Sequence, residues 1–232
     1  MSTYNVKEES TKKKAPISSV VWNQCWTVLM EMMKDRQWRN IVPASDVDTL
    51  YNQYRNARSL VILLASAEKA VGPSGCRYCA MNGESRCRLS VFVVLTSNFT
   101  SPALQHIETL RHDVSHLIVI FQDKVTATLR DDFFRLKKYE LELKPFSQLY
   151  VNVSKHQLVP RHRRLTEVEE TELLALFRCT RDKIPSILVT DPVVRYYNFP
   201  VGSLLEIERP PKYYRHVVFA VAKTNYEKFF CD

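Results

Sequence analysis

Apolar side chains recur at three- and four-residue spacing near the beginning of the chain. Five large residues follow this spacing: Trp22, Trp26, Leu29, Met30 and Met33. Such a period places side chains on one face of a helix. The pattern therefore predicts a helix from Ser19 to the charged residues 34–36, with a tryptophan and methionine face that is buried in a core.

The pattern then changes several times before residue 145. A second helix is predicted after Ser45, with Asp46 and Asp48 in its first turn, where the helix dipole favours acids. Continuous apolar runs predict strands at 60–65, 89–95 and 117–121. Further helices are expected from Ser101-Pro102 to about Arg111, and at 126–136. Because strands alternate with helices, we expect an α/β layer.

After Pro145 the elements become short. Residues 149–153 alternate apolar and polar side chains, which predicts a strand. Thr166 with Glu169 three residues later has the spacing of a capping box, and so begins a helix. Its expected buried side chains are Leu173, Leu174 and Phe177. The remaining expected elements are a strand at 187–189, a helix capped by Asp191 with Pro192 at its first position, and strands at about 203–208 and 215–222.

One stretch, 72–87, holds three of the four glycines of the chain and three of its six cysteines. Cys76 and Cys79 have the two-residue spacing that lets two thiolates reach one zinc ion, and Cys87 follows. A fourth ligand would have to come from elsewhere, with His106, His112 and His116 as the candidates. We expect a thiol-bearing surface loop without a metal, and no cofactor.

No pattern of an autonomous enzyme is present. The sequence contains no phosphate-binding loop, dinucleotide fingerprint, serine elbow or HExxH motif. A nuclease would need clustered carboxylates and a lysine on adjacent strands to hold Mg²⁺. The carboxylates near strands are Asp131, Asp132, Glu140 and Glu142, and the interleaved Leu141, Leu143 and Lys144 are typical of an ordinary amphipathic edge.

The charge of the chain favours a polyanionic neighbour but does not identify one. Its formal net charge is +8, which suits nucleic acid and equally suits a basic surface that keeps the protein soluble. No apolar run reaches the length of a membrane span. The first residues lack the apolar core of a secretory signal, so reduced thiols in the cytosol or nucleus are expected.

Two stretches after residue 148 are more specific. One is His156-Gln157-Leu158-Val159-Pro160-Arg161-His162 and the other is Asp191-Pro192-Val193-Val194-Arg195-Tyr196. With the capped helix and Ile184-Pro185, they resemble in order and spacing the assembly domain of the fifth Rpb-type subunit of eukaryotic nuclear DNA-directed RNA polymerases. The archaeal counterpart of that subunit shares the assembly domain. The opening helix is similar to the family's N-terminal part, which the archaeal counterpart lacks.

The resemblance implies an α/β N-terminal jaw domain plus a small α+β C-terminal assembly domain. The expected boundaries are a flexible tail at 1–17, a jaw-like domain at 18–145 with the 72–87 loop as an insertion, an assembly domain at 146–222 and an extension at 223–232.

The function that the resemblance implies is that of a non-catalytic polymerase subunit in the nucleus, or in the nucleolus if the polymerase makes ribosomal RNA. The assembly domain would dock on the largest subunit, and the jaw would line the channel for downstream duplex DNA, with no membrane or small-molecule substrate involved. The carried-over partner-binding residues are His156, Leu158, Val159, Pro160, His162, Pro185, Asp191, Pro192 and Tyr196.

The resemblance maps the DNA-facing turn of the jaw to Thr126-Ala127-Thr128, with Ala127 in place of the relatives' proline. The nucleic-acid-binding residues that it implies are Thr126 and the flanking Lys124 and Arg130. An alternative stays open, namely a free nucleic-acid-binding or transcription-regulatory protein that reuses the assembly domain. The class of polymerase also stays open.

Overall fold

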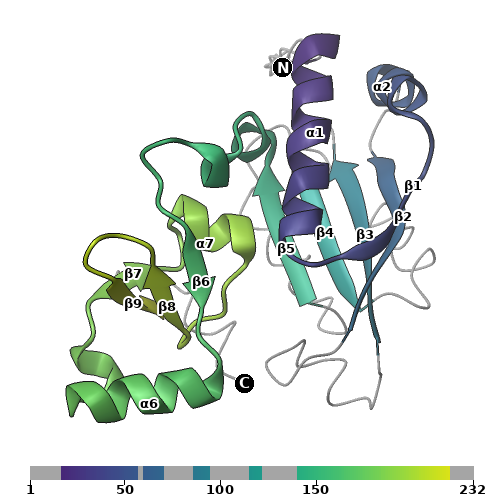
Figure 1. Cartoon of the computed structure of the whole chain (residues 1–232). Coiled ribbons are helices and arrows are strands. Elements are labelled where there is room, and N and C mark those ends of the chain that lie inside the picture. Colours follow the sequence, from purple (N-terminus) through teal and green to yellow (C-terminus); the bar gives the residue numbers. More distant parts are fainter. Residues whose placement is uncertain (1–16, 57–59, 71–85, 95–114, 122–139, 220–232) are drawn as a thin grey trace, which may run out of the picture.

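The computed structural model describes residues 17–56, 60–70, 86–94, 115–121 and 140–219. These residues form two sheet-and-helix domains that lie side by side (Figure 1). The N-terminal domain contains, in order, α1 (Ser19–Asp35), β1 (Arg39–Pro43), α2 (Val47–Asn56), β2 (Leu60–Ala70), β3 (Arg86–Val94), β4 (His116–Phe121) and β5 (Glu140–Pro145).

A connector with two short 3-10 helices follows, η1 (Phe146–Leu149) and η2 (Val153–Lys155). The C-terminal domain then contains β6 (His162–Arg164), α6 (Glu167–Phe177), η3 (Arg181–Lys183), β7 (Ser186–Leu188), α7 (Pro192–Tyr197), β8 (Leu204–Ile207) and β9 (Tyr213–Val218). The mixture of helices and sheets agrees with the expected classes of the two domains.

The N-terminal sheet has five strands in chain order, from β1 to β5. The pairs β1–β2 and β2–β3 are antiparallel, whereas β3, β4 and β5 are parallel. Parallel neighbours require long crossover connections. Those connections, including the helices expected at 101–111 and 126–136, lie outside the described residues.

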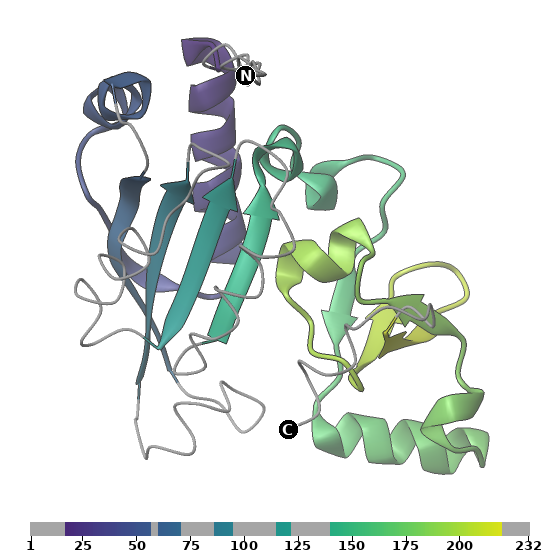
Figure 2. The ribbon, with the colours of Figure 1, turned by 180° about the vertical axis from the view of Figure 1, so that it is seen from behind.

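Helix α1 covers one face of this sheet (Figures 1 and 2), and its predicted tryptophan and methionine face is confirmed. Trp22 and Met33 are almost fully buried, in one cluster with Leu64 of β2 and Ile118 of β4. The ring of Trp22 stacks on Tyr54 of α2 at 4.7 Å between centroids. Helix, strand and second helix therefore share a single apolar core.

Residue 17, at the end of the expected tail, is held by α2. The backbone N–H of Ile17 donates to the Tyr54 hydroxyl at 3.1 Å, and its carbonyl accepts from the Tyr51 hydroxyl at 3.2 Å. The rest of the expected tail, residues 1–16, lies outside the described part of the chain. The expected extension at 223–232 lies outside it as well.

The C-terminal sheet has the order β6-β8-β9-β7, with β7 and β9 parallel. A helix packs on each face. On the α6 side the buried cluster is Leu165, Leu173, Ile184 and Leu204, and on the α7 side it is Ile187, Val194, Leu205 and Val217. Because neighbouring residues of a strand point to opposite faces, Leu204 and Leu205 of β8 serve the two clusters in turn.

The predicted helix caps of this domain are confirmed. Thr166 accepts a hydrogen bond from the Glu169 backbone, and the Glu169 carboxylate accepts from the Thr166 N–H, which completes the capping box. Asp191 caps α7, with Pro192 in its first turn. The expected buried face of α6 is wrong at Phe177, which is 50% exposed and rests edge-on against Tyr214. Glu170 of the same helix, by contrast, is buried.

The strand expected at 149–153 is wrong, because the chain forms the two 3-10 helices of the connector instead. The side chain of Asn152 accepts from the backbone N–H and the hydroxyl of Ser154 at 2.9 and 2.6 Å. This local bonding competes with a strand ladder. Leu149 packs with Trp22 in the N-terminal core, while Val151 is 58% exposed. The alternation of apolar residues reflects two different environments rather than two faces of a sheet.

Removing the cap of α6 tests the local stability of this domain. We expect Thr166→Ala to lower the free energy of unfolding by about 1 kcal/mol, since one N-cap side chain is lost. Denaturant unfolding measures the change. Thr171→Ala is the matched control, because this threonine is exposed in the middle of the same helix. Its effect should stay within about 0.5 kcal/mol, and equal losses in the two variants would contradict the role of the cap.

Candidate functional site

Four of the expected partner-binding residues lie in a tight turn between η2 and β6. The N–H of Val159 donates to the His156 carbonyl at 2.9 Å, and the N–H of Leu158 donates to His156 Nδ1 at 3.2 Å. This turn pushes Leu158 outward, where its side chain is 81% exposed, the largest exposure among the exposed large apolar residues of the described chain. Val159 and Pro160 are half-buried behind it.

His162 continues this surface on strand β6. Its Nδ1 lies 2.8 Å from the Pro160 carbonyl, which fixes the ring. Burial lowers the pKa of His162, and the hydrogen bond to Pro160 and the charge of Asp191 only partly oppose this. The ring is therefore neutral near pH 7. Asp191 is itself engaged as the cap of α7, accepting from the Val193 N–H at 2.8 Å.

The last three expected residues divide into exposed and buried positions. Pro185 and Pro192 are exposed beside β7 and at the start of α7. Tyr196 is only 4% exposed, and its hydroxyl donates to Asp35 of α1 at 2.7 Å. Burial and this hydrogen bond raise the pKa of the Tyr196 hydroxyl. In this structure Tyr196 therefore contacts the N-terminal domain of its own chain.

The expected DNA-facing residues Lys124, Thr126 and Arg130 lie outside the described residues, as do Cys76 and Cys79. Cys87 lies on β3, where it pairs with Lys69 of β2 in the backbone register. Within the described ranges, no group of three or more histidine, cysteine or acidic residues is placed to hold a metal ion. In the same ranges no helix combines the length and the apolar character needed to cross a membrane.

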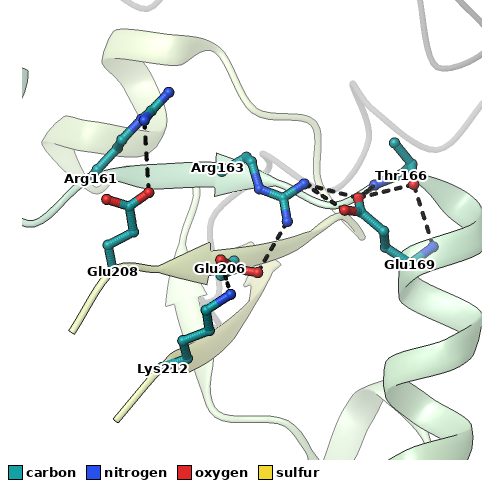
Figure 3. Close-up of polar contacts among 7 residues, drawn as sticks. All are labelled: Arg161, Arg163, Thr166, Glu169, Glu206, Glu208 and Lys212. Atoms are coloured by element: carbon teal, nitrogen blue, oxygen red, sulfur yellow. Dashed lines mark hydrogen bonds and ion pairs between the residues drawn. The ribbon is translucent and has the colours of Figure 1, made fainter. Parts of the chain in front are cut away.

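The basic stretch at 161–164 forms part of an ion-pair network (Figure 3). Arg163 bridges Glu169 of α6 at 2.8 Å and Glu206 of β8 at 3.0 Å. The second oxygen of Glu206 pairs with Lys212 at 3.1 Å, and Arg161 approaches Glu208 at 3.8 Å. Three cations thus meet three carboxylates. These pairs offset the charges of Arg161, Arg163 and Lys212.

A second polar cluster, which the sequence analysis missed, joins the two domains. We call it the polar junction, and it consists of Arg36, Glu142 and Lys144 together with the carbonyl groups of Arg195 and Tyr196. Arg36 binds both oxygens of Glu142, at 2.7 and 2.9 Å, and Lys144 lies 2.7 Å from the same carboxylate. The expectation of an ordinary amphipathic edge at Glu142 and Lys144 is therefore wrong. Their spacing of two residues on one strand was the available signal.

Burial sets the electrostatics of the polar junction. The side chains of Arg36 and Lys144 are 5% and 2% exposed, and that of Glu142 is 17% exposed. Burial alone would raise the pKa of Glu142, but the charges and hydrogen bonds of Arg36 and Lys144 outweigh it and hold this pKa well below its usual range. Burial lowers the pKa of Lys144 to about 8, against the opposing pull of Glu142. With both of its oxygens engaged, Glu142 is not available to hold Mg²⁺ for a nuclease.

Comparison with known proteins agrees with this geometry in the C-terminal half. Residues 151–219 match the family model described as RNA polymerase Rpb5, C-terminal domain. This segment contains all of the C-terminal domain to the end of β9. It also contains the tight turn at 156–160, which we call the exposed turn. The protein therefore belongs to the class of chains that carry an Rpb5-type C-terminal domain.

Relatives extend the match toward the N-terminus. The chain is 36% identical over 96 residues to DNA-directed RNA polymerases I, II, and III subunit rpabc1 of Dictyostelium discoideum, covering 40% of this chain and 49% of the relative. It is 33% identical over 99 residues to the corresponding subunit of Caenorhabditis elegans, covering 42% and 47%. The chain thus spans about half the length of these curated relatives.

A third relative is matched over most of its length. The chain is 26% identical over 182 residues to DNA-directed RNA polymerases IV and V subunit 5B of Arabidopsis thaliana, covering 77% of this chain and 78% of the relative. Together these matches show that the chain is similar to Rpb5-type subunits, in its C-terminal domain above all.

The polar junction makes stability depend on pH in a defined direction. Because the folded pKa of Glu142 lies below the value of 4.5 for an unperturbed carboxyl group, its contribution is present above pH 4.5 and is lost as the pH falls further. At pH 7, Glu142→Gln should lower the free energy of unfolding by about 3 kcal/mol, since two buried cations lose their anion. Denaturant unfolding from pH 7 to pH 3 should show the two proteins converging in acid.

The control for this experiment is Glu172→Gln, at an exposed position of α6. It should change the free energy of unfolding by no more than about 0.5 kcal/mol at any pH. If the free energies of unfolding of wild type and Glu142→Gln differ by the same amount from pH 7 down to pH 3, Glu142 does not stabilise the fold as a buried carboxylate.

Proposed function

We propose that this chain is a non-catalytic subunit of a DNA-directed RNA polymerase, acting in transcription in the nucleus. Its C-terminal domain would dock on the largest subunit, and its N-terminal domain would line the channel for downstream DNA. The observation that carries the proposal is the match of residues 151–219 to the Rpb5 C-terminal domain, which coincides with a separately cored structural unit.

The exposed turn is the part of this domain best suited to docking. Leu158 is 81% exposed, and Tyr150 and Val151 of the same connector are 40% and 58% exposed. An apolar side chain that projects from a turn held by its own hydrogen bonds loses little entropy on binding, so it can fill a partner's pocket efficiently. His156 and Pro160 flank it.

The alternative, a free nucleic-acid-binding protein, receives less support from the C-terminal domain. In its most basic stretch Arg163 is paired with Glu169 and Glu206, and Arg161 with Glu208 (Figure 3). Binding to phosphates needs cations that can neutralise them and so release the counterions condensed on the nucleic acid. A contact with DNA is therefore proposed for the N-terminal domain, through Lys124, Thr126 and Arg130.

Docking through the exposed turn can be tested by co-purification. We expect Leu158→Asp in the full-length chain to reduce recovery of the largest polymerase subunit by about tenfold or more, because a charge cannot enter an apolar pocket unpaired. Leu176→Asp is the matched control, since this leucine of α6 is 75% exposed on another part of the domain. Equal recovery with the two variants would count against docking through the turn, and no polymerase subunit with the wild-type chain would count against the function itself.

Contact of the N-terminal domain with DNA should depend on charge and not on sequence. We expect Lys124→Ala with Arg130→Ala to weaken association of the assembled polymerase with downstream DNA similarly for unrelated sequences. The slope of log affinity against log salt should become shallower by roughly 2, as two phosphate contacts are lost. Filter binding over a salt series measures both quantities.

The control for the DNA experiment replaces Arg178 and Lys183, two exposed cations of the C-terminal domain, by alanine. It should leave the slope unchanged. The rate of nucleotide addition by a formed elongation complex should also stay constant. An effect confined to one DNA sequence, or a loss of nucleotide addition with DNA binding intact, would refute the proposed contact.

A further inference from the structure

The last turn of α7 is completed by the other domain. The final carbonyl groups of a helix have no partner within the helix and must find one elsewhere. In α7 the Tyr196 carbonyl accepts from Arg36 Nε at 2.6 Å. The Arg195 carbonyl accepts from Arg36 Nη2 at 2.9 Å and from Lys144 Nζ at 2.8 Å. The C-terminal domain therefore depends on the N-terminal domain for the end of one helix.

The carbonyl end of α7 supplies hydrogen-bond acceptors to both cations of the polar junction. Arg36 and Lys144 bring two positive charges into a buried site that holds a single carboxylate, Glu142. The carbonyl end of a helix carries partial negative charge, which favours cations. The end of α7 thus supplies carbonyl acceptors for both cations, and moving it away would remove these hydrogen bonds.

Beside the polar junction, the C-terminal domain and the connector in turn donate hydrogen bonds to the N-terminal domain. The Arg195 side chain donates from Nη2 to the Leu143 carbonyl on the edge strand β5, at 3.1 Å. The connector is tied to α1 as well, because Glu31 accepts from Asn152 at 2.7 Å and pairs with Lys155 at 2.5 Å. These bonds point along several directions and therefore restrict rotation of one domain against the other.

Hydrogen bonds between charged groups and planar partners are directional, whereas apolar contact tolerates sliding. The apolar contribution of α7 to the N-terminal core comes from Tyr196 and the half-buried Tyr197. We propose that the polar junction is a latch: it holds the C-terminal domain in one orientation against the N-terminal sheet, and opening it lets the domains swing about the connector at 150–160. This inference does not depend on which partner the protein binds.

Residual dipolar couplings of backbone amides in the full-length chain test the latch, since they report the relative orientation of two domains. The test variant combines Arg36→Gln, Glu142→Gln and Lys144→Met, which removes all three charges together and leaves no unpaired buried ion. In wild type we expect one alignment tensor to fit both domains. In the variant we expect two tensors, with that of the smaller domain reduced in magnitude by averaging.

The control variant combines Arg163→Gln with Glu206→Gln, a pair that lies within the C-terminal domain (Figure 3). It should keep one tensor. If the triple variant folds and one tensor still fits both domains in the wild-type orientation, the proposal is overturned. If it does not fold, Arg36→Lys keeps a positive charge beside Glu142 but removes the guanidinium hydrogen bonds to the Arg195 and Tyr196 carbonyl groups. Two tensors are then expected, and one tensor overturns the proposal.

Discussion

The position of the C-terminal domain depends on two buried cations that share one carboxylate. Arg36 ends α1, Lys144 lies on the edge strand β5, and Glu142 lies between them with both oxygens engaged. Burying an ion costs several kcal/mol unless partners surround it, and here the carbonyl end of α7 completes the set. Helix, strand and the second domain therefore constrain one another through a single cluster. Apolar contact joins the two domains as well, because Tyr196 of α7 packs in the N-terminal core.

This constraint also divides the surface of the C-terminal domain. The side that carries α7 contacts the N-terminal domain of the same chain, because Tyr196 is buried against α1. The exposed turn at Leu158 and helix α6 stay on the outside, with α6 on the side remote from the N-terminal sheet in both views (Figures 1 and 2). A partner that binds the turn would hold a domain whose orientation is already set. Docking through the turn, as proposed, would therefore also set the position of the N-terminal sheet.

Local features were predicted well from the sequence. The capping box of Thr166 and Glu169, and the cap formed by Asp191 and Pro192, are confirmed because each needs only residues within one helical turn. Helix α1 is confirmed because its apolar period extends over many residues. The strand expected at 149–153 failed where a local side-chain bond at Asn152 competed with sheet pairing. Short elements without a period of their own, such as β1 and β6, were missed because their pairing partners are distant in sequence.

By itself the sequence determined the mixture of helices and sheets, the caps, the buried face of α1 and the motif that marks the C-terminal domain as Rpb5-type. Only the tertiary structure decided which polar residues face the core. Arg36 looked like the charged end of a helix, and Glu142 with Lys144 looked like the solvent side of a strand. Their roles depend on hydrogen bonds across 106 residues of sequence, between Arg36 and Glu142, and across 160 residues, between Arg36 and Tyr196. Periodicity records which face of an element is apolar, but the partner of a buried charge is set by the packing of elements that are far apart in the chain.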